Sequence, residues 1–132
     1  MSIGRWVYLN YYIGEFSEKI GLSIDTLRYY EKIGLIYPNR DNINRRVYCE
    51  KDIEWLNFIF RLKETNMPIK EIQYYSKLRY EGDSTLSERL KLLEKQMDRL
   101  YTQKSNIENN IVHLEKKINT YKKMINETVI KD

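Results

Sequence analysis

The segment SIDTLRYYEKIGLI (Ser23–Ile36) places an arginine directly before two tyrosines. Adjacent residues on a helix lie about 100° apart, so one buried face cannot hold Arg28, Tyr29 and Tyr30 together. A guanidinium can bond to guanine or to phosphate, and a tyrosine hydroxyl can donate to phosphate. We predict that Thr26, Arg28 and Tyr29 face outward to bind DNA, while Tyr30 packs at the edge. These residues alone would suit the surface of a small helical domain equally well.

Two short helices are predicted to position this surface. Apolar residues at positions 13, 16 and 20 share one helical face, and Gly21 ends that helix. Ser23 is suited to cap a second helix, which runs to Lys32 and is closed by Gly34. Two helices joined by the short turn GLS have the spacing of a helix-turn-helix, in which the second helix enters the major groove.

The next segment is predicted to form a short hairpin or wing. Pro38 stops any helix, and the residues that follow, NRDNINRRVY (Asn39–Tyr48), are polar, turn-rich and end in an alternating pattern. Asn42 and Asn44 can both adopt the left-handed conformation that tight turns use. A wing beside a helix-turn-helix would add a second contact to a nucleic acid.

Two amphipathic helices are predicted after the wing. The first, EKDIEWLNFIFRLKET, spans residues 50–65 and carries apolar residues at three- and four-residue steps. Met67-Pro68 breaks this pattern, and IKEIQYYSKL at 69–78 forms another short helix. The fold class expected for residues 11–80 is therefore all-α with a small wing, which is a winged helix-turn-helix domain.

A long C-terminal helix is predicted over residues 85–126, begun by a capping box of Thr85 and Glu88. Apolar residues recur in it at alternating steps of four and three, interrupted only by Lys104, as is typical of a coiled coil. A helix of about 40 residues extends about 60 Å, too far to be buried against a head of this size. We therefore expect a homodimer. The predicted dimerisation residues are Leu86, Leu90, Leu93, Met97, Leu100, Ile107, Ile111, Leu114, Ile118 and Tyr121.

Lys104 also indicates the direction of the pairing. In a parallel dimer two Lys104 ammonium groups would meet in one core layer. In an antiparallel dimer each lysine lies against an aliphatic residue and extends its charge to solvent. The sequence therefore favours an antiparallel coiled coil.

Composition excludes several classes of protein. The net charge of +4 and pI near 9.0 suit a polyanionic partner without requiring one. One cysteine, Cys49, and one histidine, His113, cannot form a disulfide or a multi-cysteine site, so we expect no metal and no cofactor. No apolar run could cross a membrane, and the first ten residues lack a secretory signal, which predicts a cytoplasmic protein. No catalytic constellation stands at chemical spacing, so we expect no enzyme.

Residues 11–72 closely resemble the DNA-binding region of the MerR family of bacterial transcription regulators. The resemblance is carried by IGEF from Ile13, TLRYYE from Thr26, GLI from Gly34 and the apolar run between Leu56 and Leu62. It implies a winged helix-turn-helix homodimer, joined by an antiparallel coiled coil, on a palindromic promoter element. Such regulators bend and untwist the promoter spacer and so act indirectly on RNA polymerase. Further matching residues are Gly21, Pro38, Arg40, Arg46, Tyr48, Asp52, Ile69, Glu71 and Ile72.

The resemblance also implies DNA contacts outside the recognition helix. By matching position, it assigns Arg40, Arg46 and Tyr48 to a first wing, and Lys63 and Lys70 to phosphate contacts in a second wing. Where the family usually has a glycine followed by an aromatic residue, this chain has Asn44 and Arg45. We therefore expect a wing turn of different shape and greater positive charge.

The sequence leaves the inducing signal and the wider role open. Residues 81–96 resemble small family members of the aldehyde- or electrophile-stress branch, which lack an effector domain. Cys49 lies beside basic residues at the start of a predicted helix, so it is either a candidate sensing thiol or an inert replacement for the usual cap. Two other functions are an architectural, excisionase-like protein that bends DNA without controlling a promoter, and a coiled-coil scaffold whose head binds protein.

Overall fold

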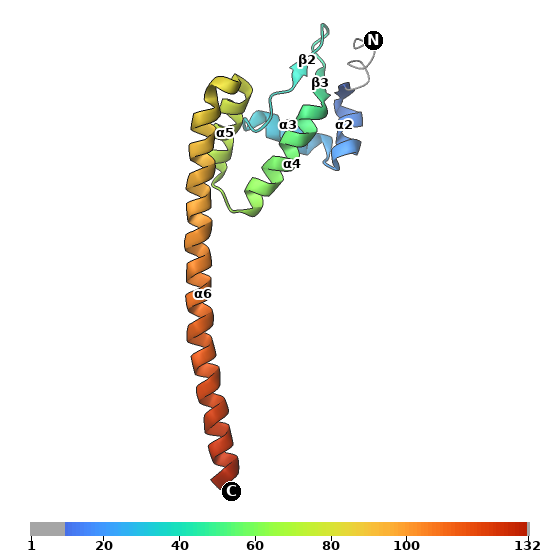
Figure 1. Cartoon of the computed structure of the whole chain (residues 1–132). Coiled ribbons are helices and arrows are strands. Elements are labelled where there is room, and N and C mark those ends of the chain that lie inside the picture. Colours follow the sequence, from blue (N-terminus) through green and yellow to red (C-terminus); the bar gives the residue numbers. More distant parts are fainter. Residues whose placement is uncertain (1–9, 132) are drawn as a thin grey trace, which may run out of the picture. The chain divides into compact units, whose positions relative to one another are not determined.

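The computed structural model describes residues 10–131, without the side chains of residues 130 and 131. The predicted lack of a secretory signal concerns residues that lie almost entirely outside this range. The described chain is mainly helical, with a small wing and a long C-terminal helix, which confirms the predicted fold class (Figure 1). Its elements are β1 (Asn10–Tyr12), α2 (Ile13–Ile20), α3 (Ile24–Lys32), β2 (Asn39–Arg40), β3 (Arg46–Cys49), α4 (Glu50–Glu64), α5 (Ile69–Glu81), the 3-10 helix η1 (Asp83–Thr85) and α6 (Leu86–Lys131).

Helices α2 and α3 form the predicted helix-turn-helix. Gly21 ends α2 in the left-handed conformation, with φ of 77°, which glycine adopts at little cost. The Ser23 side chain caps α3 by accepting from the backbone N–H of Thr26 at 3.1 Å. Phe16 of α2 and Leu27 of α3 are fully buried, so α3 turns its opposite face outward. The predicted ends of both helices are confirmed.

A three-stranded antiparallel sheet accompanies these helices, in the order β1-β3-β2. Strands β2 and β3 are the two sides of the predicted wing, and Asn44 in its turn has the left-handed φ of 67°. Asn42 does not adopt that conformation. The sequence does not predict β1, because the three residues NYY are too few to show an alternating pattern.

One hydrophobic core holds the head together. Trp55 of α4 stacks on Tyr75 of α5 with ring centroids 5.6 Å apart, and its indole N–H donates to the Leu35 carbonyl at 2.8 Å. The Ser76 hydroxyl donates to the same carbonyl at 2.5 Å, so the buried turn after α3 has its polar groups paired. The buried core residues are Phe16, Leu27, Leu35, Ile36, Tyr48, Trp55, Leu56, Ile59, Leu62, Met67, Ile72 and Tyr75.

Helix α6 begins differently from the prediction. The Thr85 hydroxyl donates to the Leu78 carbonyl at 2.6 Å, and the Glu88 carboxylate accepts from the Tyr74 hydroxyl at 2.8 Å. The predicted capping box is therefore wrong, because both side chains are engaged with α5 and η1 leads into the helix instead. Helix α6 then runs for 46 residues to Lys131, a length of about 69 Å.

The chain divides into two compact units between Leu93 and Glu94. The first unit is the head with the opening turns of α6, where Leu92 and Leu93 pack against the head core. The second unit is the remainder of α6. No helix among residues 10–131 has a stretch that is long and apolar enough to span a membrane.

Candidate nucleic-acid interface

The outer face of α3 carries the residues that the sequence predicts to bind DNA. Arg28 is exposed, and the Tyr29 side chain is 57% exposed although it is a large aromatic residue. Thr26 is half-buried, and its hydroxyl accepts from the Ser23 hydroxyl at 2.9 Å. Within about one helical turn, this face presents a guanidinium, a phenol and a hydroxyl, which are groups that contact bases and phosphates.

Tyr30 links α3 to α4 at the edge of this face. The Lys63 ammonium donates to the Tyr30 hydroxyl at 3.0 Å and lies 4.5 Å from the centre of its ring. Tyr30 is half-buried, as the prediction of an edge position requires. Lys63 is thereby held beside α3, and its ammonium keeps further protons that could be donated to a phosphate.

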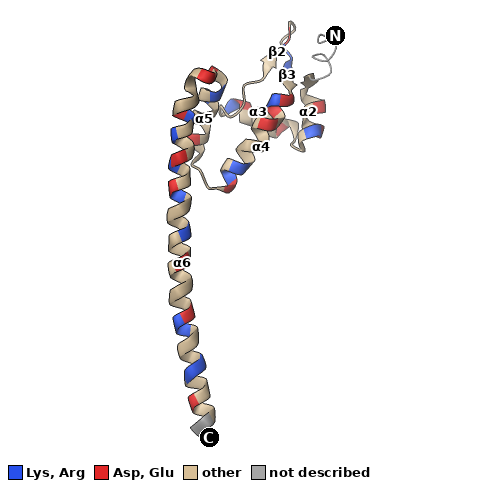
Figure 2. Cartoon of the chain, viewed as in Figure 1, with Lys and Arg blue, Asp and Glu red and all other residues tan. Residues whose placement is uncertain are grey.

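Glu31 ties the wing to α3. One of its carboxylate oxygens accepts from Arg46 Nε at 2.5 Å, and the other accepts from Arg40 Nη2 at 2.8 Å. Arg40 also donates to the backbone carbonyl of Asn44 at 3.3 Å, inside the wing turn. The two predicted wing arginines therefore join the recognition helix and the wing into one surface. Figure 2 shows basic residues on α3, on the wing and along α4.

Tyr48 belongs to the core and not to the interface. Its side chain is 1% exposed, and its ring stacks on Phe16 with centroids 4.2 Å apart. Its hydroxyl has no hydrogen-bond partner within the described part of the chain. Burial raises the pKa of Tyr48 to about 12, although the nearby Arg46 opposes this shift. The predicted DNA contact of Tyr48 is therefore wrong, because β3 turns this ring inward onto α2.

The second wing is predicted at the turn between α4 and α5. Met67 is 4% exposed and anchors the turn in the core, while Lys70 is exposed in the first turn of α5. Asn66 before them adopts the left-handed φ of 62°, which sequence reasoning did not identify. An anchored turn with an exposed lysine is suited to hold a phosphate.

Arg45 is a candidate contact that sequence reasoning did not assign. Its guanidinium lies 4.2 Å from the centre of the Tyr12 ring and donates to the Tyr12 hydroxyl at 2.8 Å. It also donates to the Asp41 carboxylate at 2.8 Å. Because Tyr12 comes from the unpredicted strand β1, only the fold reveals this anchor. The sequence signal that could have suggested this contact was Arg45 itself, a second arginine directly before Arg46.

Cys49 occupies the N-cap position of α4, between the wing and the helix, as the sequence indicates. Its backbone N–H donates to the Asp52 carboxylate at 2.9 Å. The residue also lines a pocket of about 420 Å³ together with Lys51, Arg79 and other side chains. No group of three or more metal-ligating side chains occurs within residues 10–131. Cys49 is thus a cap with some access to solvent.

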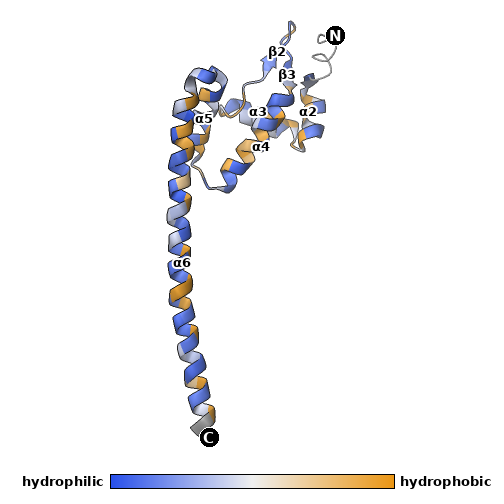
Figure 3. Ribbon diagram, viewed as in Figure 1, coloured by the Kyte–Doolittle hydropathy of each residue, from blue (hydrophilic) through white to orange (hydrophobic). Residues whose placement is uncertain are grey.

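The second unit exposes the apolar stripe that the heptad pattern predicts. Most of the predicted dimerisation residues beyond Leu93 are between 44% and 63% exposed, and Leu100 is half-buried. Figure 3 shows hydrophobic residues recurring along α6. Leu86 and Leu90 are also exposed, whereas Leu93 packs on the core of its own head. An exposed apolar stripe of this length is typical of a surface that a partner chain covers.

Comparison with known proteins gives a consistent result. Residues 11–78 match the family described as MerR HTH family regulatory protein. An HTH-type transcriptional regulator of Haemophilus influenzae is 37% identical over 117 residues, which cover 87% of this chain and 86% of that protein. The HTH-type transcriptional regulator AdhR of Bacillus subtilis is 37% identical over 89 residues, covering 67% of this chain and 64% of that protein.

Solved structures share this fold. A crystal structure of HiNmlR, a MerR family regulator lacking the sensor domain and bound to promoter DNA, superposes with a TM-score of 0.65 and 35% identity, over 87% of this chain and 92% of that chain. A MerR family transcriptional regulator from Bacillus thuringiensis gives a TM-score of 0.62 and 33% identity, over 85% of this chain and 99% of that chain. With a matching family model over half its length and relatives of this similarity, the chain is a member of the MerR HTH family of regulatory proteins.

Proposed function

We propose that this chain is a transcription regulator that binds a palindromic promoter element as a homodimer. The observation that carries the proposal is the outer face of α3, where Arg28 and Tyr29 are exposed beside a wing that Glu31 holds in place. This is the arrangement that a recognition helix needs in a major groove. The similar structure of HiNmlR is one of a regulator on promoter DNA.

The residues divide into contacts that read bases and contacts that fix position. Arg28 is suited to a forked bond with guanine, and Tyr29 and Thr26 are suited to phosphates or base edges. Arg40 and Arg46 of the first wing and Lys63 and Lys70 of the second would bind phosphates. Many such contacts supply the free energy that bends and untwists the spacer, which realigns the promoter for RNA polymerase.

The functional parts are a DNA-binding domain at residues 11–80 and a dimerisation helix at 85–126. The exposed heptad residues of α6 would pair with those of a second chain running in the opposite direction. Lys104 supports this direction because its charge can then extend past an aliphatic neighbour. Two heads related by a two-fold axis match the symmetry of a palindrome.

Several further properties follow from this role. We propose that the protein acts in the cytoplasm, needs no cofactor and has no enzymatic activity. Cys49 is its candidate sensing residue. It caps α4 directly after the wing, so a modification of its sulfur would act on the segment that positions Arg46.

Selection of duplexes from a random pool would give the operator, and fluorescence anisotropy would give its affinity. We expect Arg28→Ala to weaken operator binding about tenfold or more, the loss expected for one forked base contact. Lys116→Ala on α6 is the matched control, because it removes one positive charge far along the sequence from α3. Equal affinity of Arg28→Ala and the control would contradict the assignment of α3 as the recognition helix.

Two measurements test the dimer and the distortion. Light scattering should give about twice the chain mass of 16.1 kDa. Permanganate should react with thymines at the centre of the bound operator, because untwisted steps are unstacked. A mass equal to that of one chain would exclude binding to a palindrome as a homodimer. A promoter spacer that is bound but shows no permanganate reactivity would exclude control of RNA polymerase by realignment of the promoter.

A further inference from the structure

The tip of the wing exposes an apolar side chain. Ile43 stands in the turn between β2 and β3 and is 65% exposed, with Asn42 before it and Asn44 after it. A single exposed isoleucine is common on protein surfaces, so exposure alone gives it no role. Three features of the turn distinguish this residue.

The first feature is that the turn is held in one conformation. Asp41 Oδ1 accepts from the backbone N–H of Ile43 at 3.1 Å and from that of Arg45 at 2.8 Å. The Asn44 N–H donates to the Asp41 carbonyl at 3.0 Å, and Asn44 takes the left-handed conformation. Partial burial would raise the pKa of the Asp41 carboxyl, but the hydrogen bonds from Arg45 and Ile43 lower it on balance. The backbone that carries Ile43 is therefore held in one conformation.

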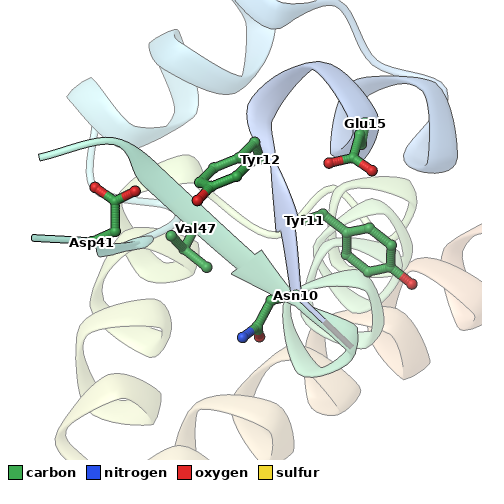
Figure 4. A pocket seen from close by; sticks show the side chains of 6 residues that line it. All are labelled: Asn10, Tyr11, Tyr12, Glu15, Asp41 and Val47. Atoms are coloured by element: carbon green, nitrogen blue, oxygen red, sulfur yellow. The ribbon is translucent and has the colours of Figure 1, made fainter. Parts of the chain in front are cut away.

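The second feature is an anchor at the base of the turn. Arg45 stacks on the Tyr12 ring and bonds both to the Tyr12 hydroxyl and to the Asp41 carboxylate. Figure 4 shows Tyr11 and Tyr12 on opposite sides of β1, with Tyr12 on the side toward Val47 and Asp41. Arg45 thus ties the tip to strand β1, and Ile43 joins this network through its backbone N–H while its side chain is exposed.

The third feature is the chemistry around the isoleucine. Asn42 and Asn44 flank it with carboxamides, and the same wing carries the guanidiniums of Arg40 and Arg45, which are paired with Glu31 and Asp41. Proteins that bind the minor groove combine these elements: amide and guanidinium donors for the groove floor and walls, and an apolar wedge that loosens base stacking. The negative charge of Asp41 is offset by its bonds to Arg45.

We propose that Ile43 enters the minor groove beside the α3 site and packs there as an apolar wedge, while Asn42 and Asn44 donate to the acceptors on the groove floor. The proposal rests on the proposed function and extends it. Glu31 fixes the wing to α3, so a helix seated in the major groove carries the tip toward the neighbouring minor groove. A wedge there would favour base steps that unstack easily and would assist distortion of the spacer.

The test uses the full chain and its selected operator. We expect Ile43→Ser to weaken binding about tenfold, because an apolar contact is lost, while Ile43→Val restores most of the affinity. The slope of log affinity against log salt should stay unchanged for Ile43→Ser, since no phosphate contact is removed. Val112→Ser, another exposed apolar residue but outside the predicted seam of α6, is the matched control and should bind like the wild type.

A modified operator locates the contact. Replacing adenines of the flanking steps with 2,6-diaminopurine adds an amino group to the minor groove and leaves the major-groove pattern intact. We expect this change to weaken the wild-type protein and to have little further effect on Ile43→Ser. Thermal unfolding of the variants should match the wild type, because Ile43 lies outside the core.

Any of the following results would overturn the proposal that Ile43 is a minor-groove wedge. Wild-type affinity of Ile43→Ser shows that the tip does not bind DNA, although the proposed function then stands. If Ile43→Ser binds the operator like the wild type but supports less transcription, the tip contacts a protein partner and not DNA. Reduced thermal stability makes Ile43 a structural residue, and an unaltered response to diaminopurine places the contact outside the minor groove. If the wild-type protein selects no duplex at all, the proposed function itself fails.

Discussion

Replacing Glu31 with glutamine should destabilise the head by releasing the wing from α3. The carboxylate bonds to Arg46 and Arg40, and the three side chains are 26% to 36% exposed. Exposed ion pairs contribute about 0.2–1 kcal/mol, whereas breaking a buried pair costs about 3–5 kcal/mol. At this intermediate exposure, with two pairs lost, we expect Glu31→Gln to lower the free energy of unfolding by about 1–2 kcal/mol.

A double-mutant cycle separates the pair from side effects of each change. Glu31→Gln and Arg46→Gln, alone and together, should show a coupling free energy of about 1 kcal/mol. Arg40→Gln in the same cycle should give a smaller value, because Arg40 is more exposed. Urea unfolding followed by circular dichroism gives these values, at one fixed protein concentration because dimerisation adds to stability.

The control is Glu115→Gln, which removes the same charge from an exposed position of α6. A coupling below about 0.3 kcal/mol, the usual error of additivity, would falsify the view that Glu31 holds the wing. A changed urea dependence without a change in midpoint would also count against it, since that indicates a different unfolded state.

Other predictions concern the core, pH and the dimer. Tyr48→Phe should leave operator affinity unchanged, because the ring is buried away from the interface. It should change the free energy of unfolding by at most about 1 kcal/mol, because the lost hydroxyl has no hydrogen-bond partner in the described chain. Weaker operator binding by this variant would show that Tyr48 does contact DNA. Burial raises the pKa of Tyr48 and of Tyr80 to about 12, above the unfolded value of about 10. The folded state therefore retains these protons more tightly, and the urea midpoint should fall as pH rises from about 10 to about 12; a flat midpoint there excludes burial of both hydroxyls. Ile111→Asp should halve the mass seen by light scattering, whereas Val112→Asp should not, and equal effects would place the dimer seam elsewhere.

Local patterns in the sequence were sufficient for the helices and for the exposed face of α3. Gly21 and Ser23 fix the ends of α2 and α3 by backbone conformation and by capping, which depend on near neighbours alone. The heptad stripe of α6 likewise follows from its period. Arg28 and Tyr29 could be placed outward because α3 buries Leu27, and residues next to it on a helix point about 100° away.

Contacts between distant segments were decided by the tertiary structure. Tyr48 matches a family position, yet whether its ring faces DNA or Phe16 depends on how β3 lies against α2. Thr85 and Glu88 have the spacing of a capping box, but bonds to α5 compete successfully with that local arrangement.

The sequence by itself therefore determined the helices, the wing and the residue types that this regulator offers to a nucleic acid, but not strand β1. The structure alone decided that Glu31 joins Arg40 and Arg46, and that Tyr12 of an unpredicted strand anchors Arg45. The reason is physical. Helix ends and periodicity arise from interactions a few residues apart, whereas an ion pair or a buried ring requires the packing of segments that only the folded chain brings together.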